Sequence, residues 1–232
     1  MNTHELVFRD RVHGGEALAE RLRREKLPQP CIVLALPRGG LPPALVVARR
    51  LQLPLDILTV RKVGAPGNPE YAVGAVADDV VYRDTDAPPG ACAEDAFRAR
   101  AAEAQAEMRR RDERYRRHLA PLGYRGHAVL LVDDGIATGD TMIAAIQAVR
   151  RHGATHVVVA TPVASREAVK RLRAFADQVI ALSVPLSFES VGQWYELFDQ
   201  VTDEEAEMLL EAAARLARPR VTPPTTLKRS AV

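Results

Sequence analysis

The sequence predicts an α/β fold built on an open parallel sheet that is flanked by helices. Short apolar segments alternate along the chain with segments of helical spacing, and several of the apolar segments carry no polar residue. Strands of that kind are typical of a parallel sheet covered on both faces. Because parallel strands need crossover connections, the intervening helices are expected to cover the sheet. A length of 232 residues suits one such domain with at most a small appendage.

The expected elements follow one another in a regular order. The apolar segments predict parallel strands over residues 31–36, 55–60, 128–132, 156–161 and 178–183. Helical spacing predicts helices over residues 14–26, 41–51, 91–119, 142–151, 165–174 and 202–216. Helix ends are marked by Pro28 after the first helix and Gly153 after the fourth, and Thr202 opens a capping box. The domain therefore spans residues 1–217, and residues 218–232, which lack apolar periodicity, are expected to be disordered.

The segment between the second and third parallel strands breaks this order. Residues 64–70 are rich in glycine and proline, which predicts a loop. Residues 71–76 and 80–82 predict the arms of a hairpin that turns near Asp78 and Asp79. The long helix that follows carries many arginines in its second half, but acidic residues are interleaved with them. We therefore interpret that surface as a solvated helix face rather than a nucleic-acid-binding stripe.

Composition excludes several classes of function. The formal net charge is +2, so nucleic-acid binding is not expected. No apolar segment is long enough to span a bilayer, and we expect neither a signal peptide nor a membrane partner. The two cysteines lack the spacing of metal ligands, and a reduced, cytoplasmic state is the simplest expectation.

One stretch carries the strongest indication of function. The apolar strand 128–132 ends at two adjacent carboxylates, Asp133 and Asp134, and a short loop with two hydroxyl residues leads into the next helix. Open α/β sheets bind ligands at such strand ends. The unpaired N–H groups and the dipole of a helix N-terminus favour an anion, typically by about 0.3–1 kcal/mol. Carboxylates would repel that anion but accept hydrogen bonds from vicinal hydroxyls, so the two features match the two ends of a ribose 5-phosphate.

Residues 129–141 resemble the binding motif for 5-phosphoribosyl 1-pyrophosphate (PRPP) of type I phosphoribosyltransferases, in which an apolar strand, two acidic residues and a small Thr-Gly loop occur in this order. The resemblance implies that Asp133 and Asp134 bind the ribose hydroxyls and, through them or through water, Mg²⁺. It also implies that the loop binds PRPP, with residues 137–141 at the 5′-phosphate. The loop residues are Gly135, Ile136, Ala137, Thr138, Gly139, Asp140 and Thr141.

Two basic segments fit the pyrophosphate end of PRPP. Arg38, Gly39 and Gly40 follow the first strand, where the family binds pyrophosphate through backbone N–H groups and an arginine. Arg61 and Lys62 follow the second strand, where the family places further cations, although solvated charges at a strand end are the alternative. In the family a flexible loop closes over the substrate, and residues 64–71 match it. The catalytic residues implied are Arg38, Lys62, Asp133 and Asp134.

The acceptor site is expected in a hood formed mainly by residues 184–200 with part of the N-terminus. Phe188, Trp194 or Tyr195 could stack on a flat acceptor, but a small satellite core is an equally good interpretation of each. Enzymes of the family that act on 6-oxopurines usually carry an acidic residue at the position of Ala137, and alanine cannot exchange a proton. A hypoxanthine–guanine enzyme is therefore disfavoured.

The resemblance covers about residues 8–216 and implies transfer of the 5-phosphoribosyl group from PRPP to a nucleobase-like nitrogen acceptor, with release of pyrophosphate and with Mg²⁺ as cofactor. It implies small-molecule substrates and allows a homodimer. A non-catalytic protein of the same fold that senses PRPP or a nucleotide is the alternative function. A hydrolase is disfavoured because the sequence contains no Gly-x-Ser-x-Gly elbow.

Overall fold

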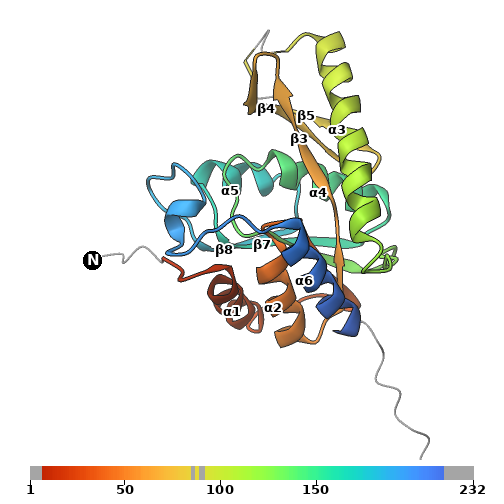
Figure 1. The fold of residues 1–232 in the computed structure, drawn as a ribbon. Coiled ribbons are helices and arrows are strands. Elements are labelled where there is room, and N and C mark those ends of the chain that lie inside the picture. The colour runs from red at the N-terminus through yellow and green to blue at the C-terminus, as the bar shows by residue number, and fades with distance from the viewer. Residues whose placement is uncertain (1–6, 85–86, 89–91, 217–232) are drawn as a thin grey trace, which may run out of the picture.

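The fold is an open parallel sheet with helices on both faces and an antiparallel insertion beside it (Figure 1). The computed structural model describes residues 7–84, 87–88 and 92–216. Five parallel strands form the main sheet in the order β2-β1-β6-β7-β8, which confirms the predicted fold class. Their bounds are β1 Cys31–Ala35, β2 Leu55–Ile57, β6 Ala128–Val132, β7 His156–Val163 and β8 Gln178–Ser183. The predicted disorder of residues 218–232 concerns residues outside the described part of the chain.

Two cores lie on opposite faces of this sheet. One face packs against α1 (Arg11–Leu22), α2 (Leu41–Leu51) and α6 (Asp203–Leu216). The other packs against α4 (Asp140–Arg151), α5 (Arg166–Leu172) and part of the insertion. Alternate residues of β1 and β6 enter the two cores: Val33 and Leu130 enter the first, whereas Leu34 and Leu131 enter the second. Burial on both faces explains why these strands have no polar residue.

The insertion consists of β3 (Val60–Ala65), β4 (Asn68–Ala77), β5 (Val80–Arg83) and α3 (Glu94–Tyr115). The predicted hairpin turn at Asp78 and Asp79 is confirmed, because β4 and β5 pair on either side of it. The predicted loop over residues 64–70 is wrong. Residues 64 and 65 continue β3 and pair with Ala72 and Asn68 of β4 across register shifts, so only a two-residue turn at Pro66 and Gly67 remains. Gly67 has a φ of +76°, which a glycine adopts without strain.

The predicted start of the last helix is confirmed. Thr202 and Glu205 form the expected capping box, with the Thr202 N–H donating to Glu205 at 2.8 Å and the Glu205 N–H donating back at 3.1 Å. The first helix begins at Arg11 rather than near residue 14, because the Asp10 side chain accepts from the N–H of His13 at 2.7 Å. The second strand is shorter than expected, since the chain leaves the sheet after Ile57 and enters the insertion.

The strand order places a topological switch point between β1 and β6. The connection from β1 through α2 leads to β2 on one side, and that from β6 through α4 leads to β7 on the other. Ligands bind in open α/β sheets at the carboxyl ends of the strands beside such a point. In the described residues, no helix combines the length and the apolar composition needed to cross a bilayer.

Candidate functional site

A pocket of about 360 Å³ opens at this switch point. The turn after β1 and the end of β6 form its floor, and the first residues of α1, β3 and α4 and part of α3 reach its walls. Its charged and polar lining residues are Arg11, Arg38, Arg111, Asp133, Asp134, Thr141 and Gln200. The structure therefore brings together three residues predicted to be catalytic, namely Arg38, Asp133 and Asp134.

Asp134 is fixed in place by protein partners. Its Oδ2 accepts from Nε of Arg11 at 2.7 Å, and each of the two side chains is 12% exposed. The hydroxyl of Tyr195 donates to the backbone oxygen of Asp134 at 2.6 Å. Burial raises the pKa of Asp134, and the Arg11 guanidinium offsets part of that rise. Asp134 therefore orients the site and holds Arg11, and less of its carboxylate is free for a ligand than the sequence suggested.

Asp133 is partly buried and has no cationic partner among the described residues. Its Oδ1 accepts from the N–H of Asp134 at 2.9 Å. Burial and the neighbouring Asp134 charge raise the pKa of Asp133 well above that of an ordinary aspartate. An uncompensated carboxylate at a pocket wall can accept hydrogen bonds from a pair of hydroxyls.

The same carboxylate fits the chemistry of Mg²⁺. Carboxylate oxygens are the ligands that this hard cation prefers, and it usually keeps several water molecules. A bound cation would also favour the charged form of Asp133, which burial and Asp134 disfavour in the protein alone. Asp134 contributes less to such a site, because its carboxylate is paired with Arg11.

The loop before α4 exposes backbone donors. Ala137 and Thr138 are exposed, and Gly139 caps the helix with a φ of +89°, a conformation that favours glycine. In the part of the chain that the structure describes, the N–H groups of residues 138–141 donate to no protein acceptor. The hydroxyl of Ser165 and the guanidinium of Arg171 hold the loop by donating to the backbone oxygens of Ala137 at 2.6 Å and Thr138 at 2.7 Å. This geometry suits a phosphate group.

Asp140 lies in this loop, but its charge is compensated. Its carboxylate is 3% exposed, accepts from the Thr138 hydroxyl at 2.7 Å and pairs with Arg171 at 3.0 Å. The carboxylate of Asp140 is therefore bound by Thr138 and Arg171 and is not left free to repel a phosphate group in the loop. The residue that neutralises it, Arg171 of α5, was not predicted from the sequence.

The turn after β1 brings Arg38 to the pocket. Its NH1 donates to Asp203 of α6 at 3.3 Å, and 22% of the arginine side chain is exposed. A Cβ on Gly40 would lie 2.7 Å from the backbone oxygens of Leu36 and Val132, so only glycine allows this approach of the turn to β6. A Cβ on Gly39 would lie 2.8 Å from Cγ of Asp134. The two glycines therefore allow the turn to pack against the acidic end of β6.

The substitution Gly39→Ala is expected to weaken affinity for ribose 5-phosphate by roughly 10-fold. The added methyl group must displace the Asp134 carboxylate, which is paired with Arg11, and such overpacking typically costs about 1–3 kcal/mol. Calorimetry measures the affinity. Gly123→Ala is the matched control, since a Cβ there meets no atom within 4 Å. Unchanged affinity in G39A would show that the packing of Gly39 on Asp134 does not shape the site.

Arg61 and Lys62 do not reach this pocket. They lie on β3 and line a separate pocket between the insertion strand and α3. Arg61 also faces Glu107 of α3 at 3.7 Å. Since β3 extends away from the switch point as part of the insertion, the two cations are separated from Arg38 and Asp133. Their predicted contact with pyrophosphate stays a prediction.

The aromatic residues of the hood form a small core. Phe8, Trp194 and Tyr195 are 1%, 4% and 6% exposed, and Phe188 is partly buried against them. Backbone pairing holds the N-terminus to the hood, with the Phe8 N–H donating to Trp194 at 2.8 Å and the Glu196 N–H donating to Phe8 at 2.8 Å. None of the three predicted acceptor residues, Phe188, Trp194 and Tyr195, lines the pocket. The satellite core, which the sequence left open, accounts for Trp194 and Tyr195.

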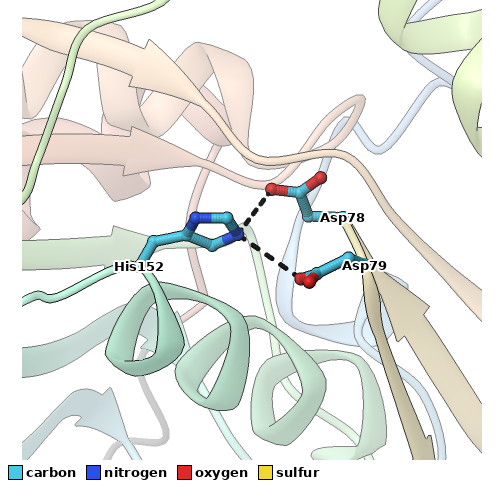
Figure 2. Close-up of side chains that lie close together, drawn as sticks. All are labelled: Asp78, Asp79 and His152. Atoms are coloured by element: carbon cyan, nitrogen blue, oxygen red, sulfur yellow. Dashed lines mark ion pairs between the residues drawn. The ribbon is translucent and has the colours of Figure 1, made fainter.

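A second group of ionisable side chains lies outside the pocket. Nε2 of His152 faces Asp78 at 2.9 Å and Asp79 at 3.4 Å, as Figure 2 shows. Arg151 also pairs with Asp79 at 3.3 Å. The three ligand atoms lie within 4.8 Å of one another, which is close enough for a metal ion; Asp78 and Asp79 are exposed and His152 is partly buried. The ion pairs explain this arrangement as a link between the β4–β5 turn and the end of α4.

Comparisons with known proteins show which family the chain resembles. Residues 9–195 match the phosphoribosyl transferase domain. Two Mycobacterium tuberculosis proteins, from strains CDC 1551 and H37Rv, are named as phosphoribosyl transferases without a stated acceptor, and each is 42% identical over 211 residues. That match covers 90% of this chain and 47% of the relative, so the chain spans about half the length of these curated relatives.

A solved structure is also similar over most of the chain. The crystal structure of the protein TT1426 from Thermus thermophilus has a TM-score of 0.77 and 48% sequence identity, covering 90% of this chain and 100% of that one. The family match spans the strand-loop-helix motif, the turn after β1 and residues 184–195 of the hood. The chain therefore belongs to the phosphoribosyl transferase domain family.

Proposed function

We propose that this protein transfers the 5-phosphoribosyl group of PRPP to a nitrogenous, nucleobase-like acceptor and releases pyrophosphate, with Mg²⁺ as cofactor. One observation carries the proposal: a single pocket presents the Asp133 carboxylate, which has no ion-pair partner among the described residues, and the Arg38 guanidinium. The loop of free N–H donors ends at Thr141, which lines the same pocket. These groups match, respectively, the hydroxyls, the pyrophosphate and the 5′-phosphate of PRPP. Membership of the family supports the same reaction type.

Each group has a definite part in the proposed reaction. Asp133 accepts hydrogen bonds from the ribose hydroxyls, and the N–H groups of residues 138–141 bind the 5′-phosphate, so the sugar is oriented at both ends. As the bond from the anomeric carbon to pyrophosphate breaks, negative charge builds on the leaving oxygens, and Arg38 stabilises it. Mg²⁺, held near Asp133, would supply further charge stabilisation of the leaving group. No nucleophilic side chain is required, because the acceptor nitrogen attacks the sugar.

Release of pyrophosphate from PRPP and Mg²⁺ in the presence of a panel of nucleobases and related acceptors tests the proposal. We expect release that depends on one class of acceptor. If PRPP binds but no acceptor in a broad panel stimulates release, the non-catalytic sensing function replaces the transferase. If PRPP does not bind, both functions are excluded.

The substitution Arg38→Ala is expected to lower kcat/KM for PRPP by roughly 10- to 100-fold while changing the affinity for ribose 5-phosphate less than about 3-fold. The reason is that Arg38 stabilises only the leaving group, and a hydrogen bond to a charged group contributes about 1.5–3 kcal/mol. Steady-state kinetics and calorimetry supply the two measurements. Arg50→Ala is the control, since Arg50 pairs with Glu16 on the exposed surface of α1 and α2. Equal losses for both ligands in R38A would remove the special role of Arg38.

A further inference from the structure

Three arginines line the pocket, and two of them are compensated by carboxylates. Arg11 pairs with Asp134 at 2.7 Å, and Arg38 pairs with Asp203 at 3.3 Å. Arg111, on α3, makes no hydrogen bond or ion pair with any residue that the structure describes. Its side chain is partly buried at the pocket wall. Among the charged residues that line the pocket, Asp133 and Arg111 thus form no ion pair with a described residue.

Neighbouring arginines on α3 behave differently. Arg110 pairs with Glu107 of the same helix, and Arg114 pairs with Asp203 at 3.1 Å and Glu204 at 3.4 Å of α6. Those ion pairs hold α3 together and fix it against α6. They account for two arginines of the helix face that the sequence analysis interpreted as solvated. Arg111 differs from them because it faces the pocket and has no such partner among the described residues.

The position of Arg111 relative to Arg38 follows from their shared surroundings. The Asp203 carboxylate and the Tyr115 hydroxyl are each within electrostatic range of both Arg38 and Arg111. Asp203 and Tyr115 are hydrogen-bonded to each other at 3.0 Å. Arg38 and Arg111 therefore share Asp203 and Tyr115 as neighbours, and both line the pocket that Thr141, the last residue of the 5′-phosphate loop, also lines.

We propose that Arg111 of the insertion binds the pyrophosphate group of PRPP together with Arg38, an inference that rests on the proposed function. A guanidinium can bind phosphate oxygens in a bidentate manner, and the Arg111 guanidinium makes no hydrogen bond or ion pair with a described residue that a phosphate group would have to displace. Arg61 and Lys62 lie in a separate pocket, so Arg111 supplies at this site the second cation that the sequence assigned to them. Because α3 belongs to the insertion, this contact also links the insertion to the ligand.

Calorimetric titration of the full chain with pyrophosphate and with ribose 5-phosphate, each in the presence of Mg²⁺, tests this assignment. Arg111→Ala is expected to weaken pyrophosphate binding roughly 10- to 100-fold and ribose 5-phosphate binding less than about 2-fold, as for loss of a hydrogen bond to a charged group. Arg110→Ala is the matched control, one residue away on the same helix, and should leave both affinities unchanged because Arg110 lines the other pocket.

The outcomes separate this inference from the proposed function. If the unmodified protein binds neither ligand, the proposed function fails and the assignment of Arg111 fails with it. If it binds both, and R111A retains its pyrophosphate affinity, the assignment alone is overturned. Arg111→Gln, which keeps most of the side-chain length without the charge, is the second variant should R111A not fold. The same loss is expected for R111Q, and unchanged pyrophosphate affinity in R111Q overturns the assignment equally.

Discussion

Replacing Asp133 with asparagine is expected to weaken affinity for ribose 5-phosphate by roughly 100-fold and, in the same variant, to raise thermal stability at neutral pH. The loss of affinity follows because two hydroxyls lose a charged acceptor, and each such hydrogen bond contributes about 1.5–3 kcal/mol. Calorimetry in the presence of Mg²⁺ measures the affinity. Asp199→Asn, the same change at an exposed carboxylate near the pocket, is the control.

The gain in stability follows from the raised pKa of Asp133. Between its ordinary pKa and its raised pKa in the folded protein, the folded state binds more protons than the unfolded state, so stability falls as pH rises through that range. The unmodified protein therefore loses stability as the pH rises from the ordinary pKa of an aspartate toward neutral, whereas asparagine cannot lose a proton. The Tm of D133N should therefore exceed that of the unmodified protein by a few degrees at pH 7 in metal-free buffer. This difference should shrink toward pH 3.5, and a lower Tm in D133N at pH 7 would contradict a strained carboxylate.

Replacing Trp194 with alanine is expected to cost about 3–5 kcal/mol of unfolding free energy, the usual effect of removing a buried tryptophan. Trp194 is 4% exposed and stacks on Phe188 with ring centroids 6.4 Å apart. Urea denaturation measures the loss, and Trp194→Phe, which keeps an aromatic ring, should lose markedly less.

The same residue distinguishes a structural role from an acceptor-binding role. Trp194 is the one tryptophan in the sequence, so its fluorescence reports on its surroundings without interference. Because it is buried in the hood core, nucleobases that bind the pocket should change its emission little. Strong quenching by an acceptor, together with a small stability loss in W194A, would restore the stacking role that the sequence left open.

The parts of the candidate site that could be predicted from the sequence are those made by neighbouring residues. Asp133 and the loop 137–141 come shortly after one strand and before one helix. The apolar strand, the carboxylates and the start of the helix can therefore be recognised in one continuous stretch of sequence. The turn at Arg38 was found for the same reason. Its place beside Asp133 could be inferred because parallel strands end at the same edge of a sheet.

The missed residues come from distant segments. Arg11 lies 123 positions from its partner Asp134, and no local pattern connects them. Arg111 is one arginine among many on α3, and only the docking of that helix selects it. The predicted loop at residues 64–70 was wrong because glycine and proline indicate a turn without indicating its length, and pairing of β3 with β4 left only Pro66 and Gly67 to form it.

The burial of the hood aromatics also depends on tertiary contacts. From the sequence, Tyr195 could face either a ligand or a core. It lies in a core because Phe8 pairs with Tyr195 in a parallel bridge, which brings the N-terminal segment against the hood. Tyr195 then donates its hydroxyl to the backbone of Asp134, which ties the hood to the pocket floor. Sequence patterns do not report a pairing between residues so far apart in the chain.

A crystal structure of the protein with ribose 5-phosphate tests the central claim most directly. We expect the phosphate group to bind the N–H groups of residues 138–141 and the ring hydroxyls to donate to the carboxylate of Asp133, while Asp134 stays paired with Arg11. Sugar density in another part of the molecule, or a bound sugar whose hydroxyls make no contact with Asp133, would contradict it.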